Sequence, residues 1–202
     1  MGNDPSFFID TYPAELLKQI AEGDQAAFRQ VFTHFYKRLN QFALSIVKTR
    51  ESAEEIVEDV FVRIWQQRET LPTIQNLRVY LYTATKNSSL NYISRKARAS
   101  ITEPFDHIHV ELNESTLTPE QILITAEIQQ KIQKAVEALP PRCKMIFKLV
   151  REDGLKYKEI AEILNISVNT IDAQMAIAVK RIALAIEAQF DFSLKKNRTA
   201  NK

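Results

Sequence analysis

The segment from Tyr157 to Ile182 has the spacing of a helix-turn-helix, the unit with which many proteins bind duplex DNA. Apolar residues at steps of three and four predict one short helix that ends near Leu164 and a second helix capped by Ser167. Asn165 lies between them and tolerates the left-handed backbone of a tight turn. The second helix is expected to bury Val168, Ile171, Met175, Val179 and Ile182.

The exposed N-terminal part of this second helix could reach base edges in the major groove, because the first helix braces it. Its candidate DNA-binding residues are Asn169, Thr170, Ala173, Gln174, Lys180 and Arg181. Asp172 and Ile177 lie among them and arginines are few, so we expect weak contacts with phosphates. The spacing alone also fits two packed helices of a bundle.

A second candidate for DNA binding is the stretch between Arg78 and Arg98, which contains no acidic residue. Its basic residues are Arg78, Lys86, Arg95, Lys96 and Arg98, interleaved with Tyr80, Tyr82 and Tyr92. Cations that neutralise phosphates, together with aromatic rings that stack on bases, are the means by which proteins hold single-stranded DNA. Some of these tyrosines can instead belong to the core. We expect burial of Tyr80, and we assign Trp65 to the core as well.

The elements that must position these residues are helices. Periodicity predicts a long helix after Asp24, its cap, and another that opens at Ser52, whose spacing to Glu55 fits a capping box. The outer face of this second helix carries Glu54, Glu55, Glu58 and Asp59. Such an acidic face suits a basic partner surface, and it also suits plain solvent. A loop at 66–76 then leads to a third helical stretch at about 77–97.

No alternating strand pattern of useful length is present, so the fold class is all-α, with two small helical domains joined by a flexible linker. The linker is acidic, and prolines interrupt it. The expected division is an N-terminal extension at 1–23, a first domain at 24–99, a linker at 100–118, a second domain at 119–188 and a polar basic tail at 189–202.

Composition argues against an enzyme. With 3 glycines in 202 residues the chain has no glycine-rich loop for a nucleotide phosphate, and its single cysteine, Cys143, can form neither an internal disulfide nor a thiolate metal site. His107 and His109 form a pair without a third ligand nearby, and His34 has no catalytic partner in the pattern. We expect no catalytic residue, no metal and no cofactor. The absence of a long apolar run or a signal peptide pattern favours a cytoplasmic protein without direct membrane insertion.

The motifs together resemble a known family. Leu139-Pro140, the run Gly154 to Glu162, Ile166-Ser167 and Thr170-Ile171 are similar to the fourth-region domain of extracytoplasmic-function (ECF) sigma factors of the sigma-70 family. The run Ser52 to Trp65 is similar to the polymerase-binding helix of their second region. Tyr80-Leu81-Tyr82, Asn87 and the run Tyr92 to Arg95 are similar to their promoter-melting helix.

The resemblance implies a transcription-initiation factor that binds core RNA polymerase and promoter DNA. Glu54, Glu55, Glu58 and Asp59 would then bind the polymerase clamp, although the family commonly has glutamine at the position of Glu58. The loop at 66–76 would hold a flipped base of the −10 element. The −10 set would be Arg78, Lys86, Asn87, Arg95, Lys96 and Arg98, and the helix-turn-helix residues would bind the −35 element.

Relatives of this kind are typically held by an anti-sigma factor, so such a partner is expected. Gln174 and the scarcity of arginines in the recognition helix resemble the variant of the family common in Bacteroidetes. Two other functions stay open at this point. The chain could be a stand-alone helix-turn-helix regulator that binds duplex DNA as a dimer, or a sigma-like protein that serves only protein–protein interaction.

Overall fold

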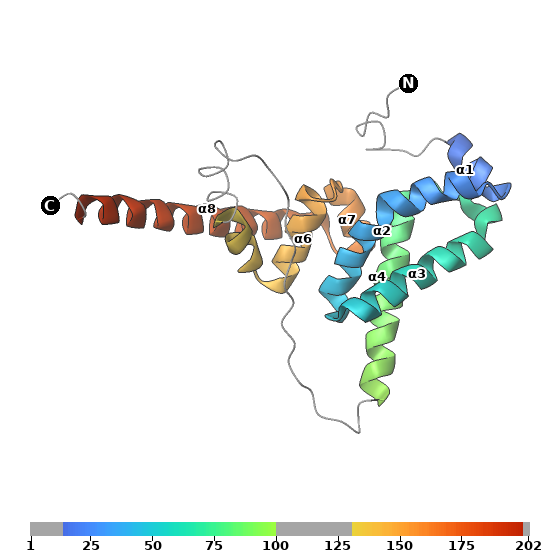
Figure 1. Cartoon of the computed structure of the whole chain (residues 1–202), viewed down its shortest axis with the longest axis horizontal. Coiled ribbons are helices and arrows are strands. Elements are labelled where there is room, and N and C mark those ends of the chain that lie inside the picture. Colours follow the sequence, from blue (N-terminus) through green and yellow to red (C-terminus); the bar gives the residue numbers. More distant parts are fainter. Residues whose placement is uncertain (1–13, 100–130, 200–202) are drawn as a thin grey trace. The chain divides into compact units, whose positions relative to one another are not determined.

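The structure is a computed structural model that describes residues 14–99 and 131–199, with side chains described for 14–97 and 131–185. Within these ranges every regular element is a helix, which confirms the all-α prediction (Figure 1). The helices are α1 (Ala14–Ala21), α2 (Gln25–Val47), α3 (Arg50–Gln66), the 3-10 helix η2 (Arg68–Thr73), α4 (Leu77–Ala99), a helical stretch at 131–137, α6 (Pro141–Arg151), α7 (Tyr157–Leu164) and α8 (Val168–Thr199).

The chain divides into two compact units. Unit 1 comprises Met1–Thr102 together with Leu149–Val168, and unit 2 comprises Glu103–Lys148 together with Asn169–Lys202. Helix α7 therefore belongs to unit 1, whereas nearly all of α8 belongs to unit 2. The two helices of the predicted helix-turn-helix are thus members of different units.

The core of unit 1 lies where α2, α3 and α4 pack on one another, and α4 crosses the other two in Figure 1. Phe35, Leu39, Val57 and Leu81 are fully buried there. The predicted cap of α2 is confirmed, because the Asp24 carboxylate accepts hydrogen bonds from the backbone amides of Ala26 (2.7 Å) and Ala27 (3.1 Å). These bonds satisfy amides that have no partner within the helix.

The predicted cap of α3 was wrong by three residues, because the N-cap is Thr49 and not Ser52. The helix begins at Arg50, and Ser52 is buried inside its first turn instead of capping it. The Ser52 hydroxyl donates to the Tyr92 hydroxyl (2.7 Å) and accepts from the Thr49 hydroxyl (2.7 Å). The Ser52 hydroxyl thus joins α3 to α4 through Tyr92 of α4. Because it makes this contact with another helix, it does not cap its own helix as the local pattern predicted.

Helix α1 lies in the segment that the sequence marked as an extension. It buries Leu16, Leu17 and Ile20 and packs on η2 and α2. Gly23 connects it to α2 with φ of 98°, a left-handed conformation that glycine adopts without strain. The loop predicted at 66–76 contains the 3-10 turn η2, with Leu71 buried.

Helix α4 carries two buried hydroxyls that explain its weak apolar pattern. Thr85 donates to the carbonyl of Leu81 (2.9 Å), and Ser89 donates to the carbonyl of Thr85 (2.8 Å). Each of these two hydroxyls is therefore satisfied within the helix. The prediction that Tyr80 is buried was wrong, because Tyr80 is only half-buried and Tyr82 is the ring in the core.

Unit 2 has a small core of Val136, Leu139, Cys143 and Ala178, against which Phe147 and Ile182 pack. The stripe predicted on α8 needs a correction, because Ala178 is buried, whereas Val168 is 40% exposed and Val179 is 53% exposed. At 100° per residue, residue 178 projects close to the direction of residue 171, whereas residue 179 projects about 80° away from it. On the surface of this unit Glu137 pairs with Lys144 (2.8 Å) and Lys148 (3.1 Å).

Candidate functional site

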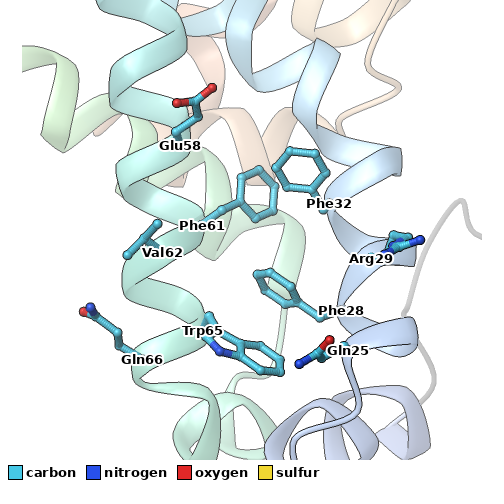
Figure 2. Close-up of a pocket in the computed structure, with 9 residues that line it drawn as sticks. All are labelled: Gln25, Phe28, Arg29, Phe32, Glu58, Phe61, Val62, Trp65 and Gln66. Atoms are coloured by element: carbon cyan, nitrogen blue, oxygen red, sulfur yellow. The ribbon is translucent and has the colours of Figure 1, made fainter.

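An open groove of about 660 Å³ lies between α2 and α3 (Figure 2). Phe28 and Phe32 from α2 face Phe61 and Trp65 from α3 across it, and Val62 of α3 lies on its wall. The sequence placed Phe28 and Phe32 on the buried stripe of α2. In the structure both rings are only partly buried, because they line the groove.

The aromatic rings of the groove pack in a continuous series. Phe32 meets Phe61 at a centroid distance of 4.8 Å, Phe61 meets Phe28 at 6.1 Å, and Phe28 meets Trp65 at 5.0 Å. The guanidinium of Arg68 covers Trp65 at 5.1 Å from the ring centroid. The assignment of Trp65 to the core was therefore wrong, because this ring is half-buried and forms a wall of the groove. Rings held in fixed positions can bind a partner's apolar side chains at little entropic cost.

The acidic residues predicted to bind the polymerase lie along α3, at and beside this groove. Glu58 lines its edge and accepts a hydrogen bond from the Tyr36 hydroxyl (3.2 Å). Burial and the neighbouring Glu58 raise the pKa of Tyr36. Glu55 and Asp59 are exposed, whereas Glu54 is half-buried and paired with Arg50 at 2.8 Å. Such a surface suits a partner with both apolar side chains and cations.

Two features of the groove could have been detected in the sequence. The first is the position of Val62, an apolar residue that lies between acidic Asp59 and basic Arg63 on the outer side of α3. In the structure its side chain is 54% exposed. Phe28 and Phe32 lie four residues apart, as do Phe61 and Trp65, so each pair occupies one helix face. Which faces meet depends on the angle at which α2 and α3 cross, and periodicity does not define that angle.

The predicted −10 residues separate into two groups along α4. Asn87, Arg95 and Lys96 are exposed, and Arg98 is on the same helix, but its side chain lies outside the described residues. Arg78 and Lys86 are half-buried and contact the segment that contains α7. The C-terminal part of α4 therefore presents its cations to solvent, while the N-terminal part does not.

The contacts between α4 and α7 are polar and specific. Arg78 donates to both carboxylate oxygens of Glu159, at 3.0 and 2.8 Å, and Asn76 donates to the same carboxylate at 2.9 Å. Lys86 donates to the carbonyl of Ile163 at 2.6 Å. Burial alone would raise the pKa of Glu159, but the bonds from the Lys156 backbone amide, Asn76 and Arg78 outweigh it and lower the pKa.

The predicted −35 residues lie along the first turns of α8. Asn169, Ala173, Lys180 and Arg181 are exposed, whereas Thr170 and Gln174 are half-buried. The predicted left-handed turn before this helix is confirmed, with φ of 53° and ψ of 55° at Asn165. Four of the six candidates are thus exposed to a ligand.

The remaining candidates supply no reactive centre in the part of the chain that the structure describes. Cys143 is buried and donates to the carbonyl of Gln174 at 3.3 Å, and burial raises the pKa of its thiol. Burial and two nearby arginines lower the pKa of His34. His107 and His109 lie outside the described residues. No group of three metal-ligating side chains, and no helix long and apolar enough to cross a membrane, occurs in the described ranges.

Comparison with protein families gives two matches in chain order. Residues 31–99 match Sigma-70 region 2, and residues 129–182 match Sigma-70, region 4. The first match covers α3, α4 and most of α2, and the second covers α6, α7 and the first half of α8.

Curated relatives have the same span. The chain is 24% identical over 166 residues to the ECF RNA polymerase sigma-E factor of Escherichia coli (strain K12), with 79% of this chain and 86% of the relative covered. It is also 24% identical over 166 residues to the ECF RNA polymerase sigma factor SigW of Bacillus subtilis (strain 168), at 79% and 88% coverage.

Two solved structures share the fold. CnrH, solved in complex with the cytosolic domain of CnrY, aligns with a TM-score of 0.53 at 19% identity, over 87% of this chain and 97% of that one. The sigma factor RpoE from Bartonella quintana, solved in complex with the anti-sigma factor NepR, aligns with a TM-score of 0.56 at 20% identity, over 79% and 96%.

Proposed function

The chain belongs to the sigma-70 family as an ECF-type RNA polymerase sigma factor, and we propose how its described surfaces divide the work of transcription initiation. The groove and acidic face of α3 bind core RNA polymerase, α4 holds the melted −10 strand, and α8 contacts the −35 element. In this proposal the chemistry of RNA synthesis stays with the polymerase.

The polymerase-binding role rests on the chemistry of the groove. Phe28, Phe61 and Trp65 offer an aromatic wall, while Glu55, Glu58 and Asp59 add negative charge on or beside it. A clamp surface that presents apolar side chains flanked by lysine or arginine would complement both parts. The apolar wall would supply most of the affinity, and the carboxylates would orient the encounter.

The observation that carries the DNA-binding role is the exposed basic end of α4. Arg95 and Lys96 lie free of acidic neighbours in the sequence, and Asn87 is exposed on the same helix. Cations spaced along a helix can follow a single strand by neutralising successive phosphates. Tyr92 is engaged with Ser52 in the structure, so the base-stacking role foreseen for it would require this hydrogen bond to break.

Contact with the −35 element is the weaker of the two DNA contacts. Ile177 is 41% exposed on α8, where a basic residue would strengthen binding, and only Lys180 and Arg181 provide cations beyond it among the candidates. Attachment to the polymerase compensates, because it raises the effective concentration of α8 near the promoter. We keep the domain boundaries at 24–99 and 119–188, joined by the segment at 100–118, as part of this proposal.

Two further parts of the proposal concern regulation and location. An anti-sigma factor is the expected inhibitor, since the solved neighbour from Bartonella quintana is in complex with one and CnrH is in complex with the cytosolic domain of CnrY. The groove between α2 and α3 is the described apolar surface that such a protein could cover in competition with the polymerase. The cytoplasm is the proposed compartment, because core RNA polymerase acts there.

Run-off transcription from a promoter library tests the proposal. Core enzyme with the chain should produce new start sites, and replacing Arg95, Lys96 and Arg98 with alanine should abolish them. The same replacement should reduce the slope of log affinity against log salt for single-stranded DNA by about 2, because three phosphate contacts are lost.

A matched control removes the same charge elsewhere. Lys18, Lys37 and Arg142 are exposed and lie outside the proposed DNA-binding surfaces. Their triple alanine variant should keep the start sites. Loss of transcription in both variants would assign the effect to net charge, and retention in both would remove the proposed role of α4.

A further inference from the structure

Helix α8 carries an exposed row of side chains at steps of four residues. We call it the α8 row, and it consists of Asn169, Ala173, Ile177 and Arg181. Four residues turn an α-helix by 400°, so each member projects about 40° from the one before it. All of them are exposed, and all belong to unit 2. The row therefore follows one side of the helix for about 18 Å.

The α8 row lies on the far side of the helix from its buried face. That buried face is formed by Ile171, Met175 and Ala178. Ala173 projects about 160° from Ile171, which is nearly the opposite direction. Ile177 projects about 120° from Ile171, and its side chain is 41% exposed. The packing that buries one face of α8 thus presents the row to solvent.

The chemistry of the α8 row changes along the helix. Asn169 at its start has an amide, which is both a donor and an acceptor and can pair with the edge of adenine. Ala173 and Ile177 in its middle have side chains of carbon atoms only. Arg181 at its end has a guanidinium, which can bind a phosphate. Polar groups therefore flank a central part of the row that makes only apolar contacts.

An apolar middle fits one group on the major-groove edge of DNA. Thymine has a C5-methyl group there, whereas guanine presents two acceptors and cytosine presents a donor. An aliphatic side chain against guanine or cytosine would leave those polar groups without partners, which is unfavourable. Arginine and lysine are the usual partners of guanine, and α8 has neither of them before Lys180. The middle of the row therefore favours thymine.

The charges along α8 agree with DNA as the partner. Asp172 is exposed and lies within the span of the row. It projects about 100° from Ala173 and about 140° from Ile177, so its carboxylate does not face the middle of the row. Lys180 and Arg181 follow Ile177 within four positions and are both exposed, so they can bind phosphates beside the base pairs.

We propose that Ala173 and Ile177 select thymine in the −35 element by contact with its C5-methyl group. This inference rests on the proposed contact of α8 with the −35 element and names the base that the contact prefers. The span from Asn169 to Ile177 is about 12 Å, which is also about the width of the major groove, so these side chains can lie against neighbouring base pairs. The scarcity of arginines in α8 then has a second consequence besides weak phosphate contacts, namely a preference for thymine over guanine.

The test uses the holoenzyme formed from core RNA polymerase and the full chain. Run-off transcription from the promoter library identifies active promoters, and their upstream elements should be enriched in thymine. Deoxyuridine differs from thymidine only in lacking the C5-methyl group. Replacing one of the enriched thymines with it should weaken holoenzyme binding about fourfold, because one buried methyl group is lost. Equal affinities for the two bases at every enriched position would overturn the proposal.

Ile177→Ala and Val179→Ala form a matched pair for the same measurement. Val179 is also apolar and is 53% exposed on the same helix, but it projects about 160° from Ile177. The effect of deoxyuridine should disappear at one thymine in Ile177→Ala and persist there in Val179→Ala. If Ile177→Ala keeps the full effect at every thymine, another group contacts the methyl groups and the role of Ile177 is refuted.

Arginine substitutions at the same two positions give a result that loss of structure cannot produce. Ile177→Arg should shift the enriched base from thymine towards guanine, because a guanidinium can donate two hydrogen bonds to guanine O6 and N7. Val179→Arg adds the same charge to α8 but should keep the preference for thymine. An identical base preference in both variants would contradict the proposal.

Further outcomes separate this inference from the proposed function. Start sites whose upstream elements prefer guanine or cytosine throughout would refute the thymine contact and leave the sigma activity standing. The absence of start sites at every promoter would refute the proposed function, and the inference that rests on it would fail as well. Weaker binding of Ile177→Ala to core RNA polymerase without DNA would assign Ile177 to a protein contact, again against the proposal.

Discussion

The two faces of unit 1 to which we assign functions differ in what covers them. Between α2 and α3 the aromatic rings remain uncovered, and the groove is open. On the second face, α4 is covered by α7, because Arg78 donates to the Glu159 carboxylate and Lys86 donates to the carbonyl of Ile163. An apolar groove gains free energy when another molecule covers it, whereas Arg78 and Lys86 already have hydrogen-bond acceptors in the chain. The first face is therefore uncovered, and these two cations of the second face are not.

The largest effect that distinguishes these faces is expected at Val62. Val62→Arg places a cation on the wall of the open groove, where a partner's apolar surface would bury it without a matching charge. We expect affinity for core RNA polymerase to fall on the order of 100-fold. The free energy of unfolding should change by less than about 0.5 kcal/mol, because the side chain is 54% exposed. Pull-down titration and urea denaturation measure the two quantities.

Ile132→Arg is the control for this substitution. Ile132 is also apolar and 37% exposed, but it lies in unit 2 and does not line the groove. Its arginine variant should bind core enzyme like wild type. If Val62→Arg also binds normally, the groove is not the polymerase site, and the comparison between an open and an occupied face loses its functional meaning.

A smaller effect, on stability, is expected on the covered face at Asp153. Burial raises the pKa of this carboxyl to about 6 from an ordinary value of 3.8. A raised carboxyl pKa means that the native state binds the proton more tightly, so this group's contribution to stability falls as the pH rises from about 4 to about 6. Asp153→Asn mimics the protonated form. It should stabilise the chain by roughly 2 kcal/mol at pH 7.5, with the gain vanishing near pH 4.

Denaturation of both proteins at several pH values checks this prediction. Only the difference between them is informative, because the lowered pKa of His34 makes stability rise with pH in both chains and so opposes the contribution of Asp153. A gain that is the same at pH 7.5 and pH 4.5 would contradict it. In that case the carboxylate would already be well solvated, and α7 would be docked by Arg78 and Lys86 without a cost at Asp153.

Local sequence patterns were sufficient for much of this structure. The all-α class, the Asp24 cap and the left-handed Asn165 follow from local rules, and each is confirmed. These features depend on residues that are close together in the chain, so periodicity and capping chemistry contain the information needed.

The errors involve partners that are distant in the chain. Ser52 meets Tyr92 forty positions later, and this contact moved it from a cap to the interior of a helix. Trp65 was assigned to the core because of its size, but the core of unit 1 closes on one side of it and Arg68 covers part of the ring. The pairing of Arg78 with Glu159 spans 81 positions, and nothing in either local sequence indicates it.

The smallest effect is expected at Arg68, at the edge of the open groove. Its planar guanidinium stacks on Trp65 at 5.1 Å and donates to the Trp65 carbonyl at 3.2 Å. Arg68→Lys keeps the charge but loses the stacked plane, so we expect a loss of about 0.5 kcal/mol in the free energy of unfolding. The chain has a single tryptophan, so its fluorescence reports this position alone. A red shift of emission in the folded variant would show that the ring has become more exposed. An unchanged spectrum would mean that Phe28 and the helix packing hold Trp65 in place by themselves, and that the groove keeps its shape without the cation.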